Sequence, residues 1–382
     1  MTNKSILFAI AATIILPFGK VFGQDKAEFK PSGKVWGYAF GDYYYKTHAD
    51  SMKRGGMQYS GLKNGSSAFE FRRVYLGYDY NISEKFSTEF LLAYEGQTLS
   101  DGATRTVFIK AANIRWKNIV PRNTLVFGQS ATPSYPLLTE KLWGYRSIEK
   151  TVLDMHKNGN SNDLGVSLLG TLDSAGNFGY NFMVGNGSAA KIENDIYKKF
   201  YGDIYAKFCD QKIVIDLYAD IEGTQLAPYH KYKKTYKLAV AYVSEKISAG
   251  VEAFEQIQHN YVTLTTPPPN TATYTADVLP FGVACFVRGP IRKDKLSFFV
   301  RADLFDPDKN FDPENIYSTS GYSGYTAEML TVAGLDITPV KNVHIMPNIW
   351  YSSCKSRVKG AAGRMKSDYD LVPRVTIHYI FK

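Results

Sequence analysis

The C-terminal segment constrains the fold of this chain most. Residues 371–382 read LVPRVTIHYIFK, in which the apolar Val375, Ile377, Tyr379 and Phe381 alternate with the polar Arg374, Thr376 and His378. Successive side chains of a β-strand point to opposite faces, so this segment predicts a strand with one apolar and one polar face. Such a strand at the end of an exported chain, with an aromatic residue next to last, is typical of an outer-membrane β-barrel.

The N-terminal residues predict export. Lys4 precedes an apolar run from Ile6 to Phe18, which is too short to cross a bilayer as a helix but suits the core of a signal peptide. We therefore expect a signal peptide at residues 1–23, with cleavage before Gln24; a retained membrane helix is the alternative. Residues 24–33 are expected to be a short periplasmic lead-in, and residues 34–382 an outer-membrane barrel.

The rest of the chain alternates between strand-like runs and links, and the links alternate in length. The short links are residues 81–85, 117–123, 173–177, 210–211, 244–246, 289–295 and 338–342. The long links are residues 46–67, 96–104, 130–162, 187–198, 223–234, 260–276, 306–324 and 353–367. This pattern predicts an all-β fold: a transmembrane, antiparallel up-and-down barrel of about sixteen strands, with short periplasmic turns and long extracellular loops.

Alternation within the strand-like runs predicts which side chains face lipid. In the second run, Val74, Leu76 and Tyr78 would face lipid, while Arg73 and Tyr75 would face the lumen. A basic side chain on the lipid face costs about 2–4 kcal/mol at the bilayer midplane, and this cost determines the register. The same reasoning places Arg301 and Arg374 in the lumen, together with Asp79, Asp216, Asp220 and Asp303. The faces of residues 249–258 and 326–337 stay unassigned.

Composition narrows the classes of function. The formal net charge is +9 at pH 7, but export argues against nucleic acid as a partner, so the charge indicates a basic lumen or a surface facing anionic lipid. The aromatic content of 14%, with 28 Tyr, suits the aromatic girdles of a membrane barrel. The three cysteines and the scattered histidines form no metal-binding pattern, so no cofactor is predicted.

Seven short motifs occur in a family-like order. They are AFEFRRVYLGYDY (68–80), ANIRW (112–116), TLVFGQ (124–129) with Pro133 after it, SIEK (147–150), DLGV (163–166), YNFMVGNG (180–187) and VRADLFDPD (300–308). In this order they resemble the phosphate-selective porin O and P family, and the resemblance covers most of the mature chain. The chain departs from the family where an ERS segment becomes Ile148-Glu149-Lys150, and at its end, Phe381-Lys382.

The resemblance implies a sixteen-stranded porin barrel, often trimeric, with loops folded into the pore. A chain of this kind would lie in the outer membrane of a Gram-negative bacterium. Its expected partners are outer-membrane lipid and lipopolysaccharide, the barrel-assembly machinery, small anionic solutes and copies of itself in a homotrimer.

The longest link, residues 130–162, is the candidate constriction. It carries the basic residues Lys141, Arg146, Lys150 and Lys157 against Glu140, Glu149 and Asp154. Folded inward, it would meet the lumenal Arg73, Arg301 and Arg374 and form a mildly positive constriction, which favours anions. The alternative is a solvated loop with local salt bridges.

A calcium site is a weaker candidate. Asp306, Asp308, Asn310 and Asp312 lie at alternate positions, and oxygen ligands at such spacing suit Ca²⁺. The segment lacks the glycine and the terminal acid of a calcium-binding loop, so a proline-stiffened loop is the alternative.

Three classes of function remain open from the sequence. The first is a porin that forms a water-filled channel for passive diffusion of small solutes, weakly selective for anions such as phosphate or other oxyanions. The second is a membrane-embedded hydrolase-type barrel, which would need fewer strands and a serine–histidine pair; no such pair is visible, so no enzyme is predicted. The third is an adhesin or assembly protein that acts through its loops.

Overall fold

The computed structural model describes residues 29–96, 105–225, 230–266, 268–269, 271–318, 322–358 and 367–382. The predicted signal peptide (1–23) and residues 24–28 of the predicted lead-in lie outside these residues. The unit Pro31–Lys382 is described by itself below.

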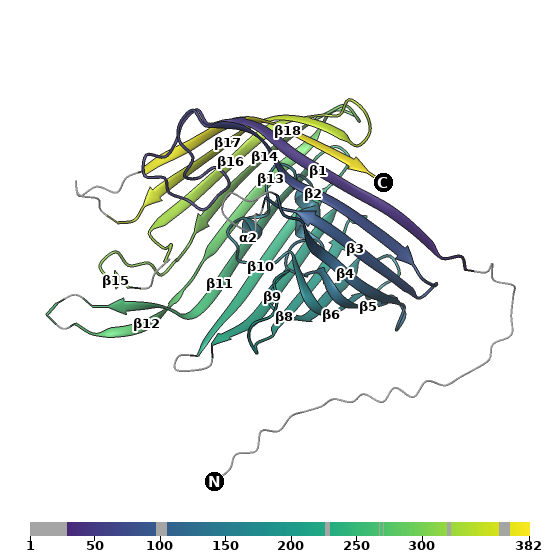
Figure 1. Ribbon diagram of the computed structural model, residues 1–382, viewed down its shortest axis with the longest axis horizontal. Coiled ribbons are helices and arrows are strands. Elements are labelled where there is room, and N and C mark those ends of the chain that lie inside the picture. Colours follow the sequence, from purple (N-terminus) through teal and green to yellow (C-terminus); the bar gives the residue numbers. More distant parts are fainter. Residues whose placement is uncertain are drawn as a thin grey trace, which may run out of the picture. The chain divides into compact units, whose positions relative to one another are not determined.

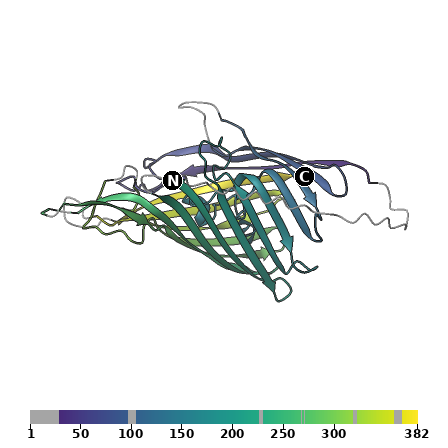
Figure 2. The same cartoon turned by 90° about the horizontal axis from the view of Figure 1, so that it is seen from below.

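The unit is a closed antiparallel barrel whose strands run obliquely to its axis (Figures 1 and 2). The first nine strands are β1 (Ser32–Tyr45), β2 (Ser67–Asn81), β3 (Phe86–Tyr94), β4 (Phe108–Lys117), β5 (Asn123–Ala131), β6 (Asn162–Thr171), β7 (Phe178–Gly185), β8 (Lys199–Phe208) and β9 (Ile213–Gln225). The others are β10 (Lys231–Val243), β11 (Ser248–Thr265), β12 (Thr273–Val278), β13 (Phe281–Arg292), β14 (Leu296–Asp306), β15 (Ile316–Tyr317), β16 (Thr326–Ile337), β17 (Val343–Ser356) and β18 (Ser367–Phe381). The two helices are α1 (Thr139–Trp143) and α2 (Val152–Met155).

Sixteen of these strands, counting β12 and β13 as one, make the barrel wall. The sheet closes because β1 pairs with β2 on one side and with β18 on the other. Strand β11 is long enough to pair with β13 along one half and with β12 along the other. Strand β15 pairs with the end of β11. The predicted antiparallel barrel of about sixteen strands is therefore confirmed.

Short turns gather at one end of the barrel, the turn end, and long links at the other, the loop end. The links alternate in length as predicted, but the predicted loops 223–234 and 260–276 are longer than the loops in the structure. Strand β9 continues to Gln225 and β10 begins at Lys231, and β11 and β12 extend the hairpin to Thr265 and from Thr273. The β11–β12 extension is rich in Thr and Tyr, which favour strands, so it continues the ladder where a loop was predicted.

The side-chain faces follow the predicted alternation. On β2, Val74, Leu76 and Tyr78 are 40%, 48% and 42% exposed, whereas Tyr75 is 4% exposed. Leu217, Leu304 and Ile349 are likewise exposed, while Asp216, Arg301 and Asn348 on the same strands are buried. The barrel therefore presents apolar side chains outward and polar side chains inward. In the described part of the chain, neither helix has the length and apolar character to cross a bilayer.

Candidate functional site

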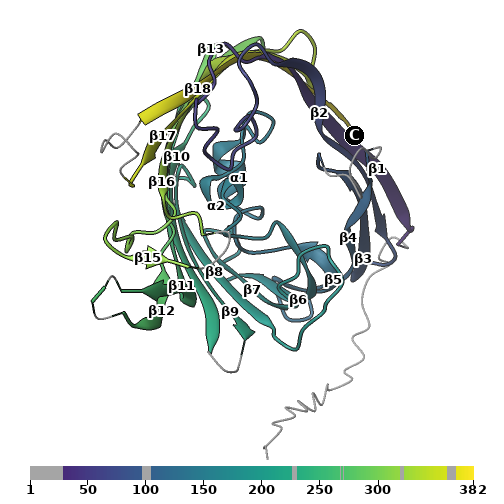
Figure 3. The same cartoon turned by 60° about the vertical axis from the view of Figure 1, so that its left-hand side comes forward.

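The link between β5 and β6, residues 132–161, lies inside the ring of strands with both helices (Figure 3). Its apolar residues Trp143, Ile148, Val152 and Leu153 are at most 2% exposed. They pack on lumenal side chains of the wall, namely Phe254, Ala284, Phe299, Leu330, Val332, Met346, Trp350 and Val372. These wall residues would meet water in an empty barrel, so the inward loop is held by burial of apolar surface.

A buried ion pair holds the first half of the inward loop. Lys237 Nζ lies 2.9 Å from Asp216 Oδ2, and both side chains are 0% exposed. Thr139 Oγ1 donates to the same carboxylate at 2.6 Å, and Lys237 Nζ donates to the carbonyl of Ser134 at 2.7 Å. We call Lys237, Asp216, Thr139 and Ser134 the lysine anchor. It satisfies two buried charges by tying α1 to β9 and β10.

Two arginines hold the middle of the inward loop. Arg374 Nη2 donates to the Ile148 carbonyl at 2.7 Å, and Arg72 donates to the carbonyls of Ile148 (3.3 Å) and Ser147. Both arginines face Asp42, which accepts from Arg72 Nη2 at 3.1 Å and lies 3.9 Å from Arg374 Nη1. The two cations share one carboxylate, and the loop carbonyls accept their remaining hydrogen bonds.

Arg72 reaches the lumen because of a β-bulge that sequence periodicity did not reveal. Strict alternation would turn Arg72 to the lipid side, since it neighbours the lumenal Arg73. The register between β1 and β2 shifts between Phe40 and Gly41, so Phe40 pairs with Arg73 and Gly41 with Phe71. A bulge puts two successive residues opposite one partner. Both arginines are therefore buried inside, at 7% and 8% exposure.

Arg301 and Arg374 lie on the lumenal side, as predicted, but under the inward loop. Arg301 binds Asp303 through two hydrogen bonds of 2.7 and 2.5 Å, beneath the ring of Trp143. Arg301 is 2% exposed and Arg374 3%. Neither lines any of the three lumenal cavities described next, because the loop that they support covers them.

Three lumenal cavities lie in series beside the inward loop. The central cavity, of about 300 Å³, is lined by the basic Arg72, Arg73, Arg146, Lys150 and Lys157 and by the acidic Glu70, Glu95 and Glu149. The turn-end cavity, of about 500 Å³, shares Phe40 and Arg146 with it. The loop-end cavity, of about 530 Å³, shares Gly56, Met155 and Lys157 with it. The shared residues place Arg146 and Lys157 at the two ends of the central cavity.

The central cations differ in how well they are neutralised. Arg146 is paired with Glu140 at 3.3 Å and with Asp154. Arg73 lies 3.9 Å from Glu95, and Lys150 lies 3.7 Å from Asp154. Lys157 is exposed and has no ion pair with any described residue. Lys141 is exposed on the loop but lines none of the three cavities.

The structure does not bring the four calcium candidates together. Asp306 pairs with Arg357, Asp308 Oδ1 accepts from the amides of Leu279 and Asn310 at 3.0 Å, and Asp312 Oδ1 accepts from the amide of Glu314 at 2.9 Å. Among the described residues, no group of three or more His, Cys, Asp or Glu could hold a metal ion. These carboxylates stabilise turns of the link between β14 and β16.

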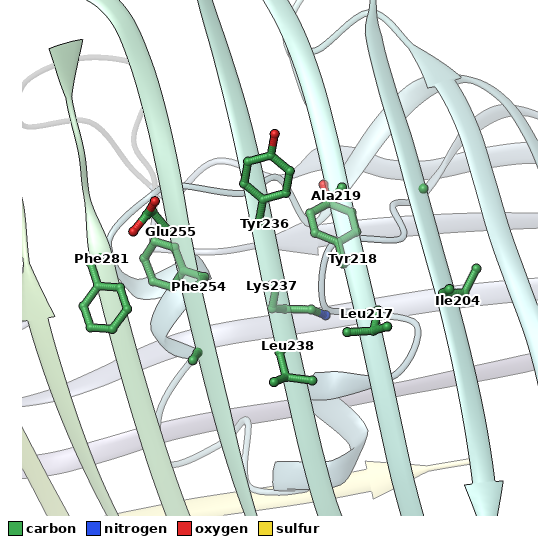
Figure 4. A pocket seen from close by; sticks show the side chains of 12 residues that line it. Ile204, Leu217, Tyr218, Ala219, Tyr236, Lys237, Leu238, Phe254, Glu255 and Phe281 are labelled. Carbon is green, nitrogen blue, oxygen red and sulfur yellow. The ribbon is translucent and has the colours of Figure 1, made fainter.

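A further cavity, of about 610 Å³, lies on the outer wall over β8 to β13. Figure 4 shows Ile204, Leu217, Leu238 and Phe281 around it. Its small residues, Gly202, Ala219 and Ala253, leave a shallow hollow in the outward apolar face. It is not part of the lumenal series.

Comparisons with known proteins give the fold. No protein-family model and no curated protein matches the chain. Solved structures do match. The anion-selective porin from Comamonas acidovorans is 11% identical, with a TM-score of 0.62 over 92% of this chain and 100% of that one. The chain has a porin fold.

Two further porin-fold neighbours are similar over almost the whole barrel. The outer-membrane channel DcaP of Acinetobacter baumannii is 14% identical, with a TM-score of 0.63 over 94% of this chain and 100% of that one. OmpT of Vibrio cholerae, an outer-membrane protein in its trimer form, is 8% identical, with a TM-score of 0.56 over 92% and 99%. At these identities the likeness concerns the fold and leaves the solute open.

Proposed function

We propose that this chain is an outer-membrane porin that lets small hydrophilic solutes diffuse passively and weakly prefers anions. The observation that carries the proposal is the series of three cavities inside a closed barrel, with five basic and three acidic side chains around the central one. A solute moving along the series would pass Lys157, Lys150, Arg73 and Arg146 in a lumen where each charge acts at short range.

The preference for anions should be modest because most of the cations are compensated. Arg146 and Arg73 have carboxylate neighbours. Arg301 pairs with Asp303, and Arg374 donates to a loop carbonyl, both beneath the inward loop. Phosphate or other oxyanions are the finer proposal, supported by the resemblance to the phosphate-selective porin O and P family and by these basic side chains. The anion-selective neighbour from Comamonas acidovorans is in keeping with it.

The setting of the channel is part of the same proposal. Export by the signal peptide would bring the chain to the outer membrane of a Gram-negative bacterium, where the assembly machinery inserts it beside lipid and lipopolysaccharide. The turn end would face the periplasm and the loop end the outside, since short turns are periplasmic in barrels of this class. The trimer form of the Vibrio cholerae neighbour supports a homotrimer.

Reconstitution in a planar bilayer tests the proposal. We expect stepwise ohmic currents and, under a KCl gradient, a zero-current potential whose sign reports anion preference. This preference should shrink at high salt, because screening shortens the range of each lumenal charge. A purified, folded barrel that carries no current would refute the proposal.

A further inference from the structure

The loop-end cavity differs in chemistry from the central cavity. Five of its lining residues carry rings that can stack: Tyr261, Phe305, Tyr322, Tyr325 and His156. Tyr261 and Tyr325 are 40% and 37% exposed. These tyrosines line a lumenal cavity, so their exposure is not explained by an aromatic girdle against lipid.

The aromatic wall is held in place by its neighbours. The ring of Tyr322 stacks on Tyr317 with centroids 4.5 Å apart, and its hydroxyl donates to Asp308. Tyr325 meets Tyr322 edge-on at 5.1 Å. Farther in, His156 stacks on Phe305 at 3.5 Å. A planar ligand stacking here would find rings that are already ordered, so little conformational entropy is lost on binding.

Free positive charge lies beside these rings. Lys233 Nζ lies 5.5 Å from the centre of the Tyr261 ring, and Lys157 lines both the loop-end and the central cavity. Neither lysine forms an ion pair with a described residue, whereas Arg54 is bound to Asp50 at 2.9 Å. Glu328 is the one acidic residue in the described lining. The cavity therefore offers stacking faces and uncompensated cations together.

We infer that the loop-end cavity is a binding site for ring-bearing carboxylates. The ring lies against Tyr261 and Tyr325, and the carboxylate points toward Lys157 at the entrance to the central cavity. A volume of about 530 Å³ is in the range of small-ligand sites. Small anions without a ring would contact only Lys157 and Lys233 and would gain nothing from the aromatic side chains. The inference rests on the proposed function, since it names the solute class that this channel would concentrate at its mouth.

Ligand-observed NMR on the full chain in detergent tests this without requiring current. The ligands are benzoate, glucuronate and acetate, which present an aromatic ring, a sugar ring and no ring. We expect a ring-bearing acid to bind about fivefold more tightly than acetate, the range of an aromatic contact. If only benzoate binds more tightly than acetate, the ligands of the cavity are aromatic acids. If only glucuronate does, they are sugar acids. Equal affinity of all three would overturn the inference.

Matched variants locate the site. Tyr261→Leu should remove most of the preference for the ring and leave acetate unchanged, while Tyr274→Leu, an exposed tyrosine outside the cavity, should change neither. Lys157→Gln should lower the affinity for each of the three carboxylates by about two- to fivefold. Lys341→Gln, at the turn end, should leave these affinities unchanged. Heat-modifiable gel mobility confirms that each variant is folded. An equal loss in the controls would refute the site.

Conductance in the same preparations separates the two proposals. A barrel that binds benzoate but carries no current would refute the porin function and retain the site. A barrel that conducts but binds acetate as tightly as the ring-bearing acids would refute the site and retain the porin function.

Discussion

The lysine anchor gives the sharpest prediction about the inward loop. Replacing Lys237 by Met leaves Asp216 buried without its cation, and Thr139 and Ser134 lose the ammonium group that they contact. Removing one partner of a fully buried pair costs about 3–5 kcal/mol. We therefore expect the free energy of unfolding of Lys237→Met to fall by about this amount, measured by denaturant titration in lipid vesicles.

The double variant Lys237→Met with Asp216→Leu separates charge from packing. It removes both charges and leaves unmade the hydrogen bonds to the loop, which are worth about 1 kcal/mol each, together with the contact between Asp216 and the buried Asp203. The double variant should therefore be more stable than the single one. Lys212→Met, in an exposed turn, is the matched control and should change stability by about 0.5 kcal/mol or less. A double variant that is less stable than Lys237→Met would refute the reasoning.

Four further predictions concern the lumenal charges, one loop ion pair and the orientation of the barrel. Arg301→Gln should lower the free energy of unfolding by about 3–5 kcal/mol, and Arg374→Gln by less, because Arg72 still pairs with Asp42; neither should shift the zero-current potential much. Lys150→Gln with Lys157→Gln should move that potential toward cation preference without destabilising the barrel. An unchanged potential, or a shift toward anion preference, would contradict the place of these two lysines in the cavity lining. In the loop after β1, burial raises the pKa of Asp50 but hydrogen bonds from Arg54 outweigh it and hold the pKa below 3.8. The stability that this pair gives is present above pH 3.8 and is lost as the pH falls below it, so Asp50→Asn should abolish that part of the acid sensitivity of the loop, followed by limited proteolysis. In a cysteine-free background, Lys63→Cys should react with an impermeant reagent on intact cells and Lys85→Cys should not; the reverse pattern would overturn the orientation.

The sequence predicted the wall of the barrel well because one physical rule governs it. Lipid on one side and water or polar side chains on the other impose a period of two, and the cost of a charge in lipid sets the register. Residues such as Leu217 and Asp216 therefore lie where their parity puts them. The alternation of short and long links follows from the same topology.

The interior was predicted less well because it depends on contacts between distant segments. Parity places Arg301 and Arg374 in the lumen but cannot say that the inward loop covers them. A signal was present: Phe299 and Trp350 have lumenal parity yet are apolar, which indicates that another segment packs on them. The bulge that turns Arg72 inward has no such signal, since it depends on how β1 and β2 pair.

The zero-current potential of single channels under a KCl gradient tests the central claim most directly. The full chain, folded and reconstituted in a planar bilayer, should open a stable ohmic conductance and give a potential of the sign that anion preference requires, smaller in concentrated salt. A potential of the opposite sign would contradict the weakly anion-selective lumen, and a folded barrel without conductance would contradict the channel itself.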